Sequence, residues 1–111
     1  MLFRSLQDKR VDPSEFNNSA IRHASKYGQI EIVRLLLEDE RVDPSTDENY
    51  AIRMASYHAH TEIVKLLLQD KRVDPSDNDN EAIFYASKNN HTETVKILSQ
   101  DKRVKKCEFY F

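Results

Sequence analysis

The chain has 111 residues, of which 39% are hydrophobic and 32% charged, so it has room for one domain with a thin core. Its net charge of −2 gives no overall attraction to nucleic acid or an anionic membrane. One cysteine, Cys107, excludes an internal disulfide, and no apolar run approaches the roughly 18 residues of a membrane span or the stretch of a signal peptide. We therefore expect a cytoplasmic protein.

One five-residue phrase organises the chain. Arg-Val-Asp-Pro-Ser stands at 10–14, 41–45 and 72–76, and Arg103 and Val104 begin a fourth copy, so the period is 31 residues. A fixed period of this length is typical of stacked repeats. The whole chain, 1–111, is thus predicted to be one repeat domain. It divides into an N-terminal half-unit (1–11), three units (12–42, 43–73 and 74–104) and a C-terminal tail (105–111).

Each unit begins with a small-residue helical pattern. Ala20, Ile21, Ala24 and Ser25 recur 31 and 62 residues later, and their spacing predicts a helix at about 19–27, 50–58 and 81–89. Asn18, Asn49 and Asn80 precede these helices, where an asparagine oxygen can accept from a free amide of the first turn. Gly28 is expected to end the first helix in a left-handed conformation, with Ala59 and Asn90 at the same place in later units.

A second pattern in each unit is rich in leucine, isoleucine and valine. It predicts helices at about 30–38, 61–69 and 92–100, with Glu31, Glu62 and Glu93 at the positive end of the helix dipole. The loop that follows is expected to be extended at Val-Asp and to turn at Asp-Pro-Ser, with one valine per unit pointing inward. Thr94 and Ser99 replace isoleucine and leucine in the third unit and are expected to make the end of the array polar.

These patterns resemble the ankyrin repeat. The family's Thr-Pro-Leu-His-x-Ala-Ala stretch corresponds to residues 19–25, with Ala20 and Arg22 in place of proline and histidine. Its Gly-His-x-Glu-Val-Val-x-Leu-Leu-Leu stretch corresponds to 59–68. The short Val-Asp-Pro-Ser loop is similar to that of ankyrin proteins from amoebae and giant viruses. The resemblance implies an all-α solenoid of antiparallel helix pairs joined by extended turning loops, with about three full units and the half-unit.

The same resemblance implies a protein–protein interaction module, an adaptor or scaffold, which grips its partner on the concave face formed by loop tips and first helices. Residues that differ between units at these positions are the candidates for that face, since shared positions serve stacking. They are Phe16, His23, Tyr27, Tyr50, Met54, Tyr57, His58, Asp79, Tyr85 and Lys88. Two alternatives stay open: these positions are merely exposed, or the protein is an assembly unit that self-associates through its ends, including the aromatic tail at 109–111.

Other functions have little support in the residues. No nucleophile with an orienting base and no glycine-rich phosphate loop is present, so we expect no enzyme, no cofactor and no small-molecule substrate. His58 and His60 stand two apart without cysteine or carboxylate partners, and we expect no metal. The basic run at 102–106 would suit nuclear import, but nothing favours nucleic-acid or membrane partners. The expected state is a monomer, with weak association through the tail as the alternative.

Overall fold

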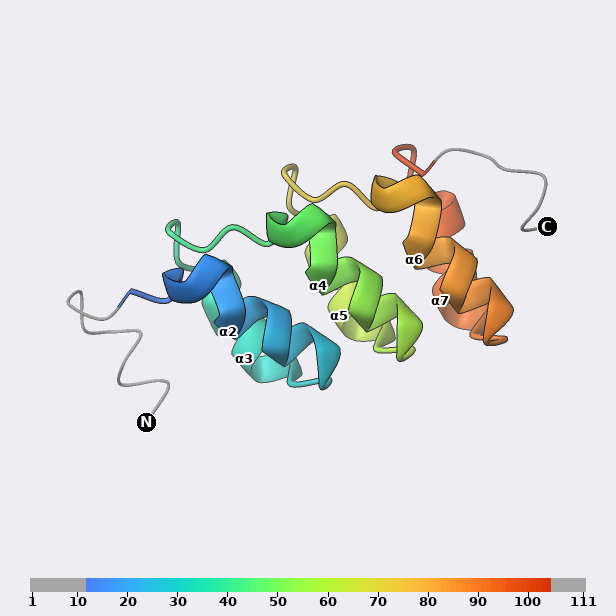
Figure 1. The fold of residues 1–111 in the computed structure, drawn as a ribbon. Coiled ribbons are helices and arrows are strands. Elements are labelled where there is room, and N and C mark those ends of the chain that lie inside the picture. Colours follow the sequence, from blue (N-terminus) through green and yellow to red (C-terminus); the bar gives the residue numbers. More distant parts are fainter. Residues whose placement is uncertain (1–11, 105–111) are drawn as a thin grey trace.

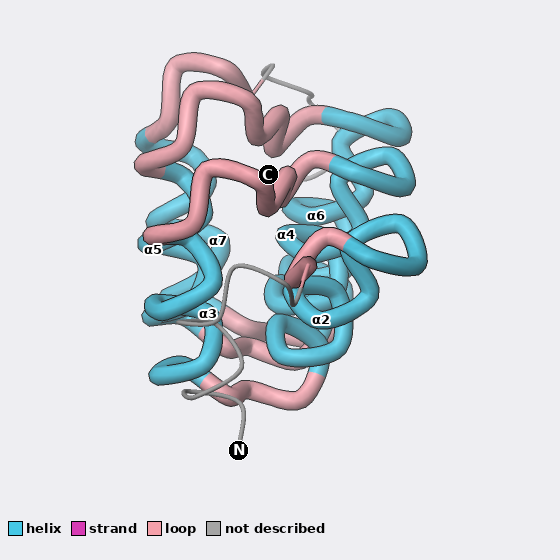
Figure 2. Tube along the Cα trace, turned by 90° about the vertical axis from the view of Figure 1, so that its left-hand side faces the viewer, coloured by secondary structure: helices cyan, strands magenta, loops and turns pink. Residues whose placement is uncertain are grey.

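The computed structural model describes residues 12–104, and these residues form six helices and no strand (Figure 1). The helices are α2 (Glu15–Lys26), α3 (Ile30–Leu37), α4 (Thr46–Tyr57), α5 (Thr61–Leu68), α6 (Asp77–Lys88) and α7 (Thr92–Gln100). They form two layers: α2, α4 and α6 make the first layer, and α3, α5 and α7 the second (Figure 2). The predicted half-unit at 1–11 and tail at 105–111 lie outside the described residues.

The core lies between and within the two layers and uses the same positions in every unit. Its members are fully or almost fully buried, and they include Ile21, Ala24, Val33, Leu36, Val42, Ala51, Ile52, Ala55, Ile63, Val64, Leu67, Val73, Ala82, Ile83, Ala86 and Leu98. The alanines let the first-layer helices pack closely against one another. Helices of 8 to 12 residues are too short to be stable alone, so each depends on its neighbours. No helix of residues 12–104 is long and apolar enough to cross a membrane.

The second-layer helices begin and end within one residue of the predicted bounds. Gly28 has a φ of +74° and ends the first helix as expected. Ala59 and Asn90, with φ values of 59° and 62°, adopt the same left-handed conformation despite having a side chain. The predicted inward valine is confirmed in two units, since Val42 and Val73 are 0% and 1% exposed.

The start of each first helix differs from the prediction. Phe16, Asn17 and Asn18 have φ values of 56–58° and form a left-handed turn before the right-handed helix. The same turn occurs at 47–49 and 78–80. Asn18 therefore does not cap its own helix, and that prediction was wrong. Its buried Oδ1 instead accepts a hydrogen bond from the backbone N–H of Asp43, at 2.8 Å, in the next unit.

The repeated phrase builds the turn that joins units. In the second unit the Oδ1 of Asp43 accepts from both the N–H and the Oγ of Ser45, at 2.9 and 2.6 Å, and the other units repeat this pair of bonds. The arginine of the phrase pairs with the aspartate two residues before it, as Arg72 does with Asp70. This pair lies in solvent and contributes little by itself. Its effect is to fix the shape of the turn.

Contacts between neighbouring loops extend this pattern. Arg103, from the fourth copy of the phrase, donates to the backbone carbonyls of Leu68 at the end of α5 and of Asp70 and Val73 in the loop that follows it. Its own partner two residues earlier, Asp101, holds the guanidinium in position. The loops thus stack on one another as the helices do.

One expected end-face residue lies inside the array. Thr94 is only 1% exposed, and its hydroxyl lies 3.1 Å from that of Thr61 in the preceding unit. The prediction that it makes the end polar was therefore wrong, because this position faces the previous helix pair. Ser99 is exposed and donates to the carbonyl of Lys96.

Candidate partner-binding face

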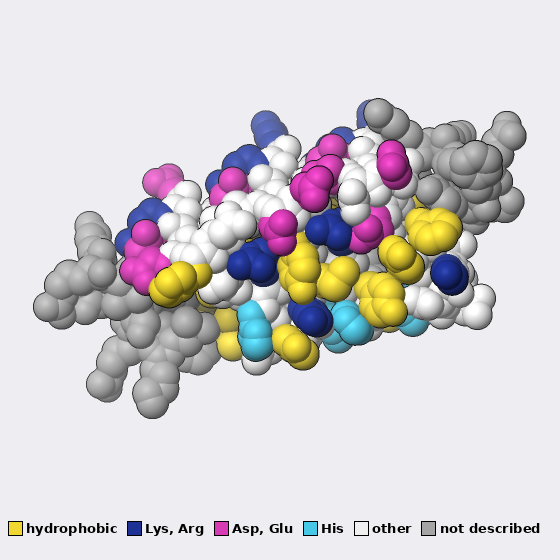
Figure 3. Space-filling view, viewed as in Figure 1, with side chains coloured by type: hydrophobic (Ala, Val, Ile, Leu, Met, Phe, Trp, Pro, Cys, Tyr) yellow, Lys and Arg dark blue, Asp and Glu magenta, His cyan; other side chains and the backbone are white. Residues whose placement is uncertain are grey.

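The outward positions of the first-layer helices form one continuous surface, which we call the first-helix face. Its side chains come from α2, α4 and α6 and from the residues that directly follow α2 and α4, and they are His23, Lys26, Tyr27, Met54, Tyr57, His58, Phe84, Tyr85 and Lys88. Figure 3 shows hydrophobic, basic and histidine side chains together on this side of the molecule, with acidic side chains mainly along the upper edge. The left-handed turns lie at that upper end of the helices (Figure 1).

The aromatic side chains of this face form a cluster across α4 and α6. The rings of Tyr57 and Tyr85 have centroids 5.4 Å apart, and Phe84 lies edge-on to Tyr85 at 5.1 Å. Tyr57 and Phe84 remain 39% and 37% exposed. Directly after α2, the ring of Tyr27 lies tilted against that of His23, with centroids 4.6 Å apart, and is 58% exposed. These rings are braced by neighbours yet open to solvent, as the anchors of a protein interface are.

The arginine that replaces the family's histidine holds the left-handed turn. Arg22 donates from Nε to the carbonyl of Asn17 at 3.0 Å and from Nη2 to that of Phe16 at 3.1 Å. Arg53 makes the same two bonds to carbonyls of its own turn. These guanidinium groups lie 5.6 and 5.7 Å from the ring centroid of Tyr50, which lies between them.

The arginine of the second unit makes one more contact, to the third unit. The Nη1 of Arg53 forms a 2.6 Å ion pair with Oε1 of Glu81, and both side chains are largely buried, at 12% and 21% exposure. The third unit has Phe84 where the first two have arginine, so its turn lacks this brace. Phe84 thereby adds to the aromatic cluster.

Histidines hold the lower end of the first-layer helices. The Nε2 of His60 lies 3.0 Å from the carbonyl oxygen of Lys26, and that of His91 lies 2.9 Å from the carbonyl of Tyr57. Each of these two histidines thus links the start of a second-layer helix to the end of the first-layer helix of the preceding unit. His58 stacks on His60 at 5.9 Å, and burial, followed by the charges of His60 and Lys26, lowers the pKa of His58 below its usual value of 6.5. Within residues 12–104 no three histidine, cysteine or carboxylate side chains are placed to hold a metal ion.

The structure separates the ten candidate residues into three groups. Two of them, Phe16 at 81% exposure and Asp79, lie on the left-handed turns, away from the helical surface. Tyr50 lies half-buried between two arginines. The remaining seven lie together on the first-helix face: His23, Tyr27, Met54, Tyr57, His58, Tyr85 and Lys88.

Sequence reasoning missed two residues of this region, Arg22 and Phe84. Arg22 was read only as a departure from the family's motif, although a long cationic side chain has more donors than the histidine it replaces. Phe84 differs from the arginine of the other units, and this contrast between units is the signal that would have found it.

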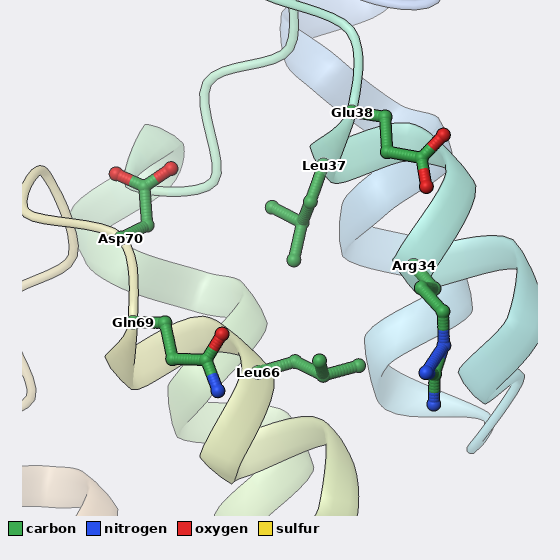
Figure 4. A pocket seen from close by; sticks show the side chains of 6 residues that line it. All are labelled: Arg34, Leu37, Glu38, Leu66, Gln69 and Asp70. Atoms are coloured by element: carbon green, nitrogen blue, oxygen red, sulfur yellow. The ribbon is translucent and has the colours of Figure 1, made fainter.

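Two of the hollows in the described surface differ in their lining. One, of about 200 Å³, lies on the first layer between α2 and α4, and its lining consists of Ser19, Arg22, His23, Lys26, Tyr27 and Tyr50. The other, of about 280 Å³, lies between α3 and α5, where Leu37 and Leu66 point into a rim of mixed charge formed by Arg34, Glu38, Gln69 and Asp70 (Figure 4). Only the first hollow adjoins the aromatic side chains.

Comparison with known families agrees with this architecture. A family model for ankyrin repeats, in three copies, matches residues 2–79 and 21–108. Searches among curated proteins and among solved structures gave no match for the chain. Ankyrin repeats are in general protein–protein interaction modules and in general not enzymes. Three 31-residue units, two helical layers and a family match over nearly the whole length lead to one conclusion: the chain belongs to the ankyrin repeat family.

Proposed function

We propose that this protein is an adaptor that binds a partner protein through the first-helix face. The observation that carries the proposal is the row of solvent-exposed aromatic side chains on rigid helices, Tyr27, Tyr57 and Phe84, at 37–58% exposure. Aromatic side chains bury a large area with few rotatable bonds, and they dominate the energetics of interfaces. Positive and adaptable side chains surround them, including Lys88 and Met54.

The outer surface of the second layer offers a contrast. Its exposed positions carry ion pairs one helical turn apart: Arg34 with Glu31 at 3.8 Å and Lys65 with Glu62 at 3.2 Å. These side chains are 47–73% exposed, and such pairs keep their water. The cores of interfaces are depleted of Lys, Glu and Asp. A solvated charged surface on one layer and an aromatic one on the other favour the first layer as the binding side.

Site-specific photo-cross-linking in the cell that makes the protein tests this proposal. A photoreactive phenylalanine analogue at Tyr57 is expected to capture a partner, whereas the same analogue at Lys65, on the second layer, is expected to capture none. Equal capture from both positions would refute the choice of face.

Affinity measurements then test the anchors. Tyr57→Ala or Tyr85→Ala is expected to weaken the captured partner's binding about tenfold or more, because each truncation removes a buried ring from the complex. Lys65→Ala is the matched control and should leave affinity and helix content unchanged. If both tyrosine variants fold and bind as the original chain does, the proposal is wrong.

Self-association is the second candidate, and one observation favours it. The Oδ1 of Asn80 is buried and has no hydrogen-bond partner among residues 12–104, whereas its equivalents in the earlier units accept a backbone N–H from the following unit. An amide from another copy would satisfy it if the equivalent N–H of the same chain, at position 105 and outside the described residues, does not. Light scattering coupled to size exclusion decides the matter, since a monomer at every concentration removes this candidate.

A further inference from the structure

The step from α2 to α4 and the step from α4 to α6 differ in one charged contact. At the second step, Arg53 reaches across to Glu81, with 2.6 Å between Nη1 and Oε1. At the first step the position of Glu81 is taken by Tyr50, which has no carboxylate. The Nη1 of Arg22 has no acceptor among the described residues.

The two arginines are otherwise held alike. Both use Nε and Nη2 to bind the carbonyls of their own left-handed turn, at 2.9–3.1 Å, so their guanidinium planes are fixed in equivalent orientations. Because the repeats superpose these positions at a 31-residue spacing, Arg53 with Glu81 shows where an anionic oxygen sits relative to Arg22. The ion pair between Arg53 and Glu81 thus shows, within the same chain, how a carboxylate would bind Arg22.

The space beside Arg22 and the ring of Tyr50 is open. The hollow of about 200 Å³ between α2 and α4 has Arg22, His23 and Lys26 in its lining and no carboxylate. Tyr27 and Tyr50 supply ring surface for the methylene groups of a bound side chain. An arginine and a lysine beside one cavity favour an anion, and guanidinium groups match the geometry of carboxylates.

We propose that this hollow binds a carboxylate side chain of the partner protein, a glutamate or aspartate that completes the contact made within the chain by Glu81. The proposal rests on the function proposed above and specifies its chemistry. The partner segment is acidic where it crosses α2 and α4, and apolar where it meets Tyr57 and Tyr85. The acidic residues of this protein lie mainly on the turns at the upper edge of the face, so they do not fill the site themselves (Figure 3).

Fluorescence anisotropy with a defined probe tests the site. The probe is a labelled heptapeptide of alternating alanine and glutamate with blocked ends, and its glutamine counterpart is the neutral control, both at low ionic strength. The glutamate peptide is expected to bind about tenfold or more tightly than the glutamine peptide. Equal binding of the two peptides overturns the proposal.

Two variants test the site by adding a carboxylate beside Arg22 or by removing the one beside Arg53. Tyr50→Glu places a carboxylate beside Arg22, as Glu81 stands beside Arg53, and is expected to abolish most of the binding of the glutamate peptide. Glu81→Gln vacates Arg53 and is expected to add a second, similar site. Undiminished binding by a folded Tyr50→Glu variant contradicts the assignment.

Nuclear magnetic resonance of the unaltered chain gives an answer that does not depend on the folding of a variant. The side-chain Nε–H signal of Arg22 is expected to shift with the glutamate peptide and not with the glutamine peptide. The signal of Arg53 is the internal control, because Glu81 already occupies its Nη1. Absence of a shift at Arg22 overturns the proposal.

The affinity of the two variants Tyr57→Ala and Tyr50→Glu for the partner captured through the first-helix face tests the carboxylate site separately from the proposed function on which it rests. If Tyr57→Ala weakens its binding and Tyr50→Glu does not, the face is correct and the carboxylate site is wrong. If neither does, the proposed function itself is wrong.

Discussion

The asparagine that links each unit to the next offers an internal series of mutations. Asn49 is 4% exposed; its Oδ1 accepts from the N–H of Asp74 at 2.9 Å and its Nδ2 donates to Oδ2 of Asp77 at 2.9 Å. Asn18 makes only the first kind of bond, and the Oδ1 of Asn80 has no partner within residues 12–104. All three residues have φ of 58–60°, so replacement by alanine adds the same backbone strain at each.

These differences set the expected loss in the free energy of unfolding. An unsatisfied buried N–H costs about 1–3 kcal/mol, and loss of the partly exposed bond to Asp77 adds about 0.5–1.5 kcal/mol. Alanine in a left-handed position costs about 1 kcal/mol more than asparagine. We therefore expect losses of roughly 3–5 kcal/mol for Asn49→Ala, roughly 2–4 for Asn18→Ala and about 1 for Asn80→Ala.

Urea unfolding followed by circular dichroism at the helical band measures these losses, and the chain has no tryptophan to serve as a probe. A domain of this size has a stability of about 5–15 kcal/mol. In thermal unfolding followed by the same signal, Asn49→Ala should therefore lower the midpoint temperature by about 10 °C or more. The slope of the unfolding free energy with urea must be unchanged for the comparison to hold. Equal losses for Asn49→Ala and Asn80→Ala would refute the inter-unit role of this residue.

Three further predictions follow from individual backbone and side-chain positions. Gly28→Ala should destabilise the chain by about 2 kcal/mol or more in urea unfolding, because φ is +74° and a Cβ would lie 2.7 Å from the ring of His60; an unchanged midpoint contradicts this reasoning. Ala59→Gly should stabilise by about 0.5–1 kcal/mol in the same assay, since a left-handed φ of 59° suits glycine, and a loss of stability would count against it. Titration of the His58 ring protons by nuclear magnetic resonance should give a pKa below 6.5, lowered mainly by burial. The contribution of neutral His58 to stability is then full above about pH 6.5 and is lost as the pH falls through the pKa of the folded protein. A pKa at or above 6.5 contradicts the prediction.

The second-layer helices could be predicted well from sequence because their signals are local. A run of isoleucine, valine and leucine at helical spacing, begun by Thr61 and Glu62, needs little tertiary context to be read. The inward valine of the loop followed equally directly from its invariance and from the proline two residues later. Buried positions that every unit shares are the part of a repeat protein that one sequence reveals most clearly.

The left-handed turns could not be predicted in the same way. Asn and Asp visit positive φ as single residues, so three such residues in succession contradict local preference, and Phe16 and Glu48 have no preference for that conformation at all. Their stability comes from contacts distant in sequence, such as the hydrogen bonds from Arg22 to the turn and from Asp43 to Asn18. The recurring asparagine of each unit therefore predicts a helix cap from local sequence, whereas its hydrogen bond to the next unit depends on the fold.

The candidate face was predicted in part for a related reason. Comparing units identified Tyr27 and Tyr57, which are exposed, and Tyr85, which is half-buried, because stacking does not require the same side chain at these positions in every unit. The same comparison gave no information about which of the varying side chains contact one another, so Tyr50 was grouped with the open face although two arginines enclose it.

Neighbouring first-layer helices are attached to each other at both ends. At the upper end Asn49 binds the start of the next unit, and at the lower end His91 binds the carbonyl of Tyr57. Two attachments per step oppose swivelling of one helix pair against the next, which a single contact would permit. A partner that spans several units therefore meets a surface whose curvature is already set, and association does not have to restrict motions between units. The entropy lost on binding then falls mainly on the partner, so a flexible acidic segment would release faster than a prefolded one that makes the same contacts.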